Sequence, residues 1–241
     1  MRFVKFLLGV LMLPLCAAAT RAVFDVLANA QGKGSLFSAE AACLLAGFLI
    51  WMLCWMLLPQ PIRVYILGHE LTHALWAILF GGRAKNLRVS AKGGSVRVTK
   101  DNVLITLAPY FFPFYTILLI LLRVLLGFFL DLAPYAAAWL FLVGFTWSFH
   151  VMFTLQSLTV RQPDIHEHGR LFSYTLIYLL NMLGIGLWIA CTTSATPGGL
   201  AAALAAHTGD TYRAIVHALC AICFHVRRVL GYTLSPRGKG L

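Results

Sequence analysis

The sequence predicts an all-α polytopic membrane protein with about six transmembrane helices and a small cytoplasmic β-hairpin. Of its 241 residues, 60% are hydrophobic and only 11% are charged, whereas a soluble domain is about half apolar and about a quarter charged. At about 20 apolar residues per span, the chain has room for roughly six crossings. The composition therefore excludes an ordinary soluble domain and a disordered chain.

The net charge and the cysteines indicate a membrane setting rather than nucleic acid or secretion. The chain has 19 Lys and Arg residues against 8 Asp and Glu residues, a formal charge of +11. Basic residues typically flank membrane spans and face the cytoplasm or anionic lipid. No basic groove with interleaved aromatic residues is visible, so we expect no nucleic-acid partner. The six cysteines do not resemble a disulfide framework.

Residues 1–61 are predicted to form the N-terminal spans. The first apolar run, 3–19, begins after Arg2 and is either a retained span or a signal segment cleaved after Ala19. The highly apolar remainder of the chain favours a retained span. The second run, 36–58, is long enough to cross a membrane, and a Pro-Gln-Pro sequence ends it.

Residues 62–191 are predicted to form the core that carries the chemistry. Its first run, 62–80, has polar residues near its middle. Residues 86–99 alternate between apolar and polar on both sides of Gly93-Gly94, which predicts a β-hairpin with its turn at the glycines.

Three further runs complete the core. Run 103–130 contains Pro109 and Pro113, so we expect a kinked or broken helix there. Two more runs, 135–158 and 171–191, flank a polar loop. Residues 192–241 lack an 18-residue apolar stretch and predict a C-terminal amphipathic tail at the membrane interface.

The distribution of Lys and Arg predicts which side of the membrane each loop faces. Segment 83–101 contains six of them, which places it in the cytoplasm. The turn at Asp131 would then lie outside. Counting every preceding run as a crossing places the N-terminus outside too, which conflicts with Arg2 and Lys5. A first segment that is cleaved, or that does not span, would remove this conflict.

The most informative motif is H-E-x-x-H, formed by His69, Glu70 and His73. Residues four apart share one face of a helix, so the two imidazoles can bind one metal ion. The adjacent carboxylate can take a proton from a water molecule on that metal. Charged groups inside an apolar span are costly, and a metal ion would offset that cost.

A third ligand is expected within residues 159–170, because two histidines leave a catalytic zinc site incomplete. Asp164 is the preferred candidate, since Pro163 suits the first turn of a helix and would place the carboxylate at the start of the last span. His166, Glu167 and His168 are the alternatives.

Together, these features resemble the site-2 protease family of intramembrane zinc metallopeptidases over roughly residues 62–190. The family carries its third ligand in an N-P-D-G or L-D-G element, and this chain has Pro163 and Asp164 but neither the Asn nor the Gly. The resemblance implies Zn²⁺ bound by His69, His73 and Asp164, with Glu70 as the catalytic base. It corresponds to a minimal core without a PDZ or CBS domain.

The resemblance implies a membrane-embedded zinc endopeptidase that hydrolyses peptide bonds in or near transmembrane segments of membrane proteins. Its partners would be a membrane-protein substrate and the lipid bilayer, in a multi-pass protein of a bacterial inner membrane. The hairpin would either pair with an extended substrate strand or anchor to lipid headgroups. His150 and Asn181 could contact an oxyanion or the substrate, or could be ordinary interhelical hydrogen-bonding residues.

Two other functions also fit the sequence. One is an inactive family-like protein that binds partner helices, and the other is a metal-handling transporter, since intramembrane His and Asp residues also build ion pathways. Glu70 distinguishes these three functions, because only a peptidase needs the Glu70 carboxylate for peptide-bond cleavage. The substrate and the oligomeric state are left open by the sequence.

Overall fold

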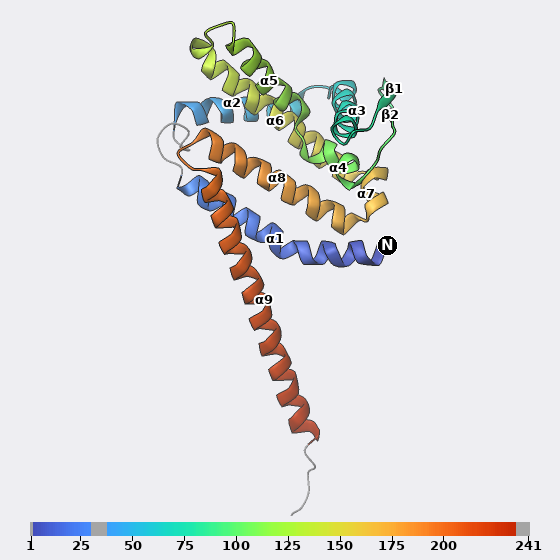
Figure 1. Cartoon of the computed structure of the whole chain (residues 1–241), viewed down its shortest axis with the longest axis vertical. Helices are drawn as coiled ribbons and strands as arrows, with labels where there is room; N and C mark the ends of the chain where they lie inside the picture. The colour runs from blue at the N-terminus through green and yellow to red at the C-terminus, as the bar shows by residue number, and fades with distance from the viewer. Residues whose placement is uncertain (1, 30–37, 235–241) are drawn as a thin grey trace, which may run out of the picture.

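The computed structural model describes residues 2–29 and 38–234, with side chains up to residue 228 in the last helix. The elements are α1 (Arg2–Ala28), α2 (Ala39–Leu57), α3 (Ile62–Leu79), β1 (Ala84–Ser90), β2 (Gly93–Val98), α4 (Val103–Phe111), α5 (Phe114–Gly127), the 3₁₀ turn η1 (Ala133–Tyr135), α6 (Ala136–Thr159), α7 (Pro163–His168), α8 (Arg170–Thr192) and α9 (Pro197–Leu234). The predicted helical architecture with one small hairpin is confirmed (Figure 1).

Within the described residues, four helical segments are long and apolar enough to cross a membrane: α1, α2, η1 with α6, and α8. The pair α4–α5, bent by 78° at its break, makes a fifth if it counts as one span. The predicted number of about six spans is therefore not confirmed. Helix α3 is not in this set, because the polar side chains of His69, Glu70 and His73 lower its mean hydropathy.

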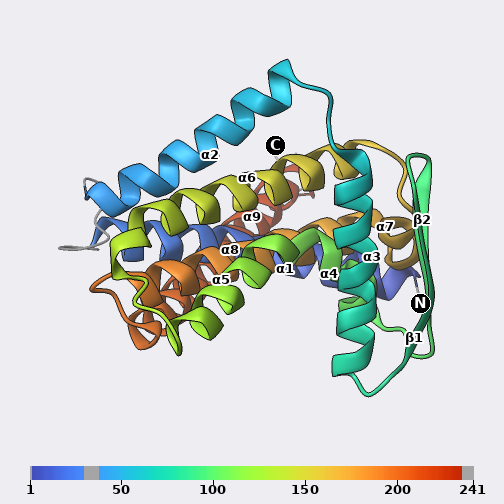
Figure 2. The ribbon, with the colours of Figure 1, turned by 90° about the horizontal axis from the view of Figure 1, so that it is seen from above.

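Helix α3 runs across the ends of the other helices rather than alongside them (Figure 2). The hairpin lies on its outer side, and α7 lies near the N-terminal end of α1. There Lys5 Nζ donates a hydrogen bond of 2.6 Å to His168 Nδ1. The N-terminus of α1, α7 and the hairpin thus occupy one end of the bundle.

The N-terminal end of α1 and the hairpin lie at the same end of the bundle (Figure 1). Among the described residues, α3 is not one of the helices that are long and apolar enough to cross a membrane. A count of crossings without run 62–80 puts the N-terminus and the hairpin on the same side, which agrees with the positive-inside rule for Arg2 and Lys5.

Helix α1 is packed into the bundle through small residues. Ala18, Ala19 and Ala22 are almost completely buried, against α8 and the first turns of α9. Small side chains let helix backbones approach closely in a membrane. These alanines lie at the cleavage point considered for a signal segment, and retention of the first segment stays a prediction.

Helices α2 and α6 approach each other through a reciprocal pair of glycines. A side chain at Gly47 would collide with the carbonyl of Phe141, and one at Gly144 would collide with the carbonyl of Leu44. Beyond the crossing, Trp51 packs edge-on against an aromatic ring of α6. This contact fixes α6, whose C-terminal end leads to α7.

The hairpin is confirmed, but its turn is not at the glycines. Strand β1 pairs antiparallel with β2, and Ser90 lies opposite Gly93. The turn is formed by Ala91 and Lys92. Gly93 and Gly94 begin β2 instead, and the absence of a side chain lets the Gly94 backbone lie directly against α3.

The break expected in run 103–130 is confirmed. The Asn102 side chain caps α4 by accepting hydrogen bonds from the amides of Leu104 and Ile105. The helix ends just before Pro113, where the chain turns into α5. Six consecutive residues of α4, from Ile105 to Tyr110, are buried, and the helix packs against α3, α7 and α8.

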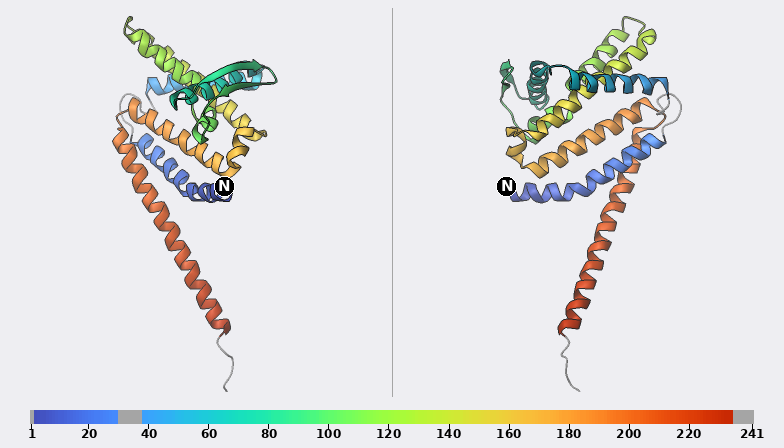
Figure 3. Two further views of the ribbon diagram at one scale, coloured as in Figure 1. Left: turned by 45° about the vertical axis from the view of Figure 1, so that its right-hand side comes forward. Right: turned by 180° about the vertical axis from the view of Figure 1, so that it is seen from behind.

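The predicted C-terminal amphipathic tail, residues 192–241, contains one long helix, α9, which begins at Pro197. Its first turns pack on α1 through Leu200, Ala203 and Leu204. The remainder extends away from the bundle in both views of Figure 3.

Candidate metal centre

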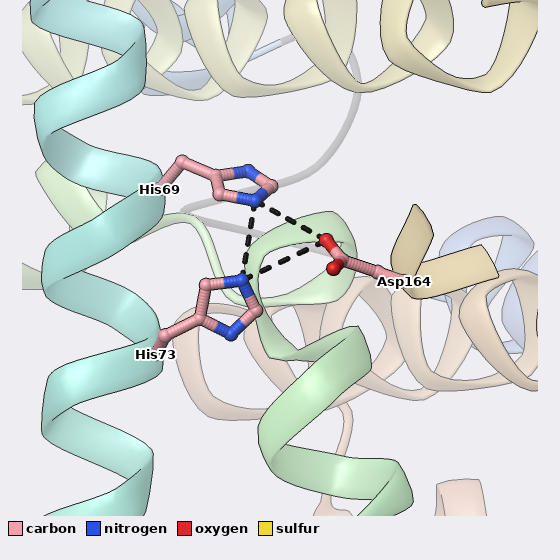
Figure 4. Close-up of side chains that lie close together, drawn as sticks. All are labelled: His69, His73 and Asp164. Atoms are coloured by element: carbon pink, nitrogen blue, oxygen red, sulfur yellow. Dashed lines mark hydrogen bonds and ion pairs between the residues drawn. The ribbon is translucent and has the colours of Figure 1, made fainter. Parts of the chain in front are cut away.

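Two elements bring three potential metal ligands to one point (Figure 4). His69 and His73 lie one turn apart on α3, with their Nε2 atoms 3.2 Å apart. Asp164 enters from α7, a short helix that begins at Pro163. Its Oδ2 atom lies 3.4 Å from His69 Nε2 and 3.7 Å from His73 Nε2.

These separations match those in a tetrahedral metal site. Bonds of roughly 2.0–2.2 Å to nitrogen and oxygen at tetrahedral angles place neighbouring ligand atoms about 3.4 Å apart. The three observed separations, between 3.2 and 3.7 Å, bracket this value. The three residues also line a common cavity, which leaves room for a fourth ligand. A search of the described residues for clusters of His, Cys, Asp and Glu side chains that could hold a metal ion finds these three residues.

Each of the three side chains has an outer hydrogen-bonding partner. His73 Nδ1 lies 2.9 Å from the carbonyl oxygen of Ile105. His69 Nδ1 lies 3.3 Å from the hydroxyl of Tyr65. The hydroxyl of Tyr110 donates to Asp164 Oδ2 at 2.9 Å. Such outer contacts orient metal ligands and fix the tautomer of coordinating histidines.

The electrostatics of the site favour the ionised form of the Asp164 carboxyl. Burial acts to raise its pKa, but the neighbouring imidazoles, His69 foremost, outweigh burial and hold the pKa below its usual range. A carboxylate must be deprotonated to bind a metal ion.

Glu70 lies in the same cavity as the two histidines. The cavity has a volume of 810 Å³ and is lined by residues of α3, the hairpin, and the segment that joins α6 to α7. The Glu70 side chain is largely buried. A Cβ at Gly94 would lie 2.8 Å from Glu70 Cγ and 2.9 Å from Glu70 Oε1, so strand β2 passes directly against this side chain.

The alternatives to Asp164 are placed elsewhere. The His166 imidazole lies next to the Arg170 guanidinium, with 3.3 Å between Nε2 and Nη2. His168 is buried and accepts its hydrogen bond from Lys5. Glu167 lines the cavity without joining the three-residue cluster.

Neither His150 nor Asn181 lines the 810 Å³ cavity. His150 is buried on α6 and lines a second cavity of 20 Å³ together with Tyr65 and His69, and its Nε2 is unpaired among the described residues. The Asn181 amide donates to the carbonyl oxygens of Tyr110 and Ile177. The oxyanion or substrate contacts of these two residues stay predictions.

Sequence reasoning missed the outer partners Tyr65 and Tyr110. Tyr65 lies four residues before His69, so helical spacing was a signal that could have found it. Its hydroxyl also pairs with Ser157 Oγ at 2.6 Å. Tyr110 carries no such local signal, because it is 54 residues from Asp164 and only the packing of α4 against α7 brings them together.

No protein-family model, curated protein or solved structure matches the chain. Its function is therefore inferred from the chemistry of the site.

Proposed function

We propose that this chain is a membrane-embedded zinc metalloendopeptidase, similar to the site-2 protease family, that hydrolyses peptide bonds in or near transmembrane segments of membrane proteins. The observation that carries the proposal is the tetrahedral spacing of His69, His73 and Asp164 beside the Glu70 carboxylate. This constellation sits at one end of a strongly apolar helical bundle.

The donor set favours zinc. Two imidazoles and one carboxylate, with a fourth position left open, are typical of catalytic zinc sites. When bound, the ion would supply a Lewis acid that polarises a carbonyl and acidifies water.

Glu70 performs the proton transfers in this proposal. Its carboxylate accepts a proton from the attacking water and delivers it to the departing amide nitrogen. The close approach of the Gly94 backbone holds the carboxylate beside the histidines. The outer contacts from Tyr65 and Tyr110 keep the ligand side chains oriented throughout.

The location of the site fits a membrane substrate cut near the cytoplasmic surface. The basic hairpin, Arg2 and Lys5 mark one end of the bundle, which the positive-inside rule assigns to the cytoplasm. The cavity is lined at this end by residues of β2 and α7. A substrate helix has its peptide bonds shielded, so it must become extended to enter. A multi-pass protein of a bacterial inner membrane stays part of this proposal, on the resemblance alone.

Replacing Glu70 by glutamine tests the proposal. We expect one zinc ion per chain in both proteins, and cleavage slowed about 10²–10⁴-fold in the variant, because glutamine cannot accept the proton. The measurement compares new peptide termini in membranes from cells producing each protein, by mass spectrometry, with zinc content measured on the purified chains. Equal sets of new termini from both proteins would contradict the peptidase and favour transport or partner binding.

A valine at Gly94 is expected to lower cleavage at least tenfold while zinc content stays unchanged. The new Cβ would lie 2.8 Å from Glu70 Cγ and 2.5 Å from Ile66 Cγ2, so either the strand or the Glu70 side chain must move. Such small displacements are costly in catalysis. Arg97→Val is the control, since its exposed position is three residues along β2. Full activity in Gly94→Val would show that β2 does not position Glu70.

A further inference from the structure

A proline inside α4 changes the hydrogen bonding of one buried carbonyl. In an α-helix, the carbonyl of residue i accepts from the amide of residue i+4. For Ile105, that position is Pro109, which has no amide hydrogen. Ile105 is only 1% exposed, so water does not readily replace the missing donor.

The donor that reaches this carbonyl is His73. Its Nδ1 atom lies 2.9 Å from the Ile105 oxygen. Because a carbonyl oxygen only accepts, Nδ1 must carry the proton. In the neutral ring, Nε2 then presents its lone pair toward His69 and Asp164.

We propose that Pro109 is a positioning residue: by leaving the Ile105 carbonyl open, it selects the metal-binding tautomer of His73 and fixes its ring. The proposal rests on the metal site of the proposed function. Metal-ligating histidines usually donate their second ring N–H to a carbonyl or a carboxylate. Here a carbonyl is free to accept from His73 because the residue at position 109 has no amide hydrogen.

Pro109 is not needed to end the helix. Helix α4 continues through Phe111, and the amide of Phe112 still reaches the carbonyl of Ala108 at 2.8 Å. The chain breaks at Pro113, where α5 begins. The consequence specific to Pro109 is therefore the freed carbonyl facing α3.

The test is Pro109→Ala in the full chain, which restores the amide hydrogen. We expect this amide to compete for the Ile105 carbonyl, and zinc affinity to fall about 10–100-fold, the usual cost of losing an outer-shell partner. Affinity is measured by chelator competition, and the tautomer by ¹⁵N NMR of the metal-free protein. The His73 signal should change from Nδ1-protonated toward Nε2-protonated, while thermal stability is unchanged or higher, since alanine suits a helix interior.

Two controls separate the amide hydrogen from other effects of proline. Pro14 lies inside α1, so Pro14→Ala removes a helical proline on another element. We expect it to leave zinc affinity and the His73 tautomer unchanged. An ester-linked α-hydroxy acid at position 109 lacks both the ring and the amide hydrogen, and it should behave like the wild-type chain.

Several results would overturn the inference. One is an Nε2-protonated His73 in the wild-type protein, which can be observed even if Pro109→Ala does not fold. Others are an unchanged affinity and tautomer in Pro109→Ala, or an ester variant as weak as the alanine variant. Absence of zinc from the wild-type protein would instead overturn the proposed function, and the tautomer measurement would still decide the role of Pro109.

Discussion

Replacing Asp164 by alanine is expected to remove zinc from the purified protein, from about one ion per chain to well below stoichiometry. The carboxylate is one of the three proposed ligands, and its loss leaves two imidazoles on a single helix. The loss of affinity should exceed the 10–100-fold typical of losing an outer-shell partner. Metal analysis of protein purified without chelators measures the content, and chelator competition measures the affinity.

The matched control for this prediction is His166→Ala. His166 lies on the same short helix, two residues from Asp164, but it is paired with Arg170 rather than with the cluster. We expect this variant to retain its zinc. Retention of zinc by Asp164→Ala, together with its loss from Glu167→Ala, would move the third ligand to Glu167.

Replacing Gly144 by valine is expected to disrupt the fold rather than the chemistry. The new side chain would collide with the main-chain carbonyl of Leu44, which cannot rotate away as a side chain can. Forcing extra atoms into a packed interface costs about 1–3 kcal/mol or more. At about 2–4 °C per kcal/mol for a chain of this size, the melting temperature should fall by up to about 10 °C.

Gly184→Val provides the control, because it adds the same side chain to a membrane-capable helix at a position with open space around it. Thermal unfolding in detergent, followed by circular dichroism, compares the two variants. A similar small shift in both would show that the α2–α6 crossing tolerates expansion. The reciprocal variant Gly47→Val should resemble Gly144→Val, since the two glycines meet the same crossing from opposite sides.

Features of the chain that depend on local geometry could be predicted from the sequence. The four-residue spacing of His69 and His73 places both rings on one face of any helix. Proline chemistry predicted the break in run 103–130, and alternation predicted the hairpin. The preference for Asp164 came from helix-start chemistry and from a resemblance, and the structure places its carboxylate at both histidines.

Features that depend on distant contacts required the tertiary structure. The same apolar run could lie alongside the other helices or across their ends, and only the packing shows that α3 does the latter (Figure 2). The role of Gly94 depends on how closely β2 approaches Glu70. The contacts of Tyr110 with Asp164, and of His73 with Ile105, join segments 54 and 32 residues apart. The sequence alone therefore determined the types of the candidate ligand residues and their local spacing. Their orientation was decided by the packing of α4 against α3 and α7, because hydrogen bonds between separate helices leave no periodic signal in the chain.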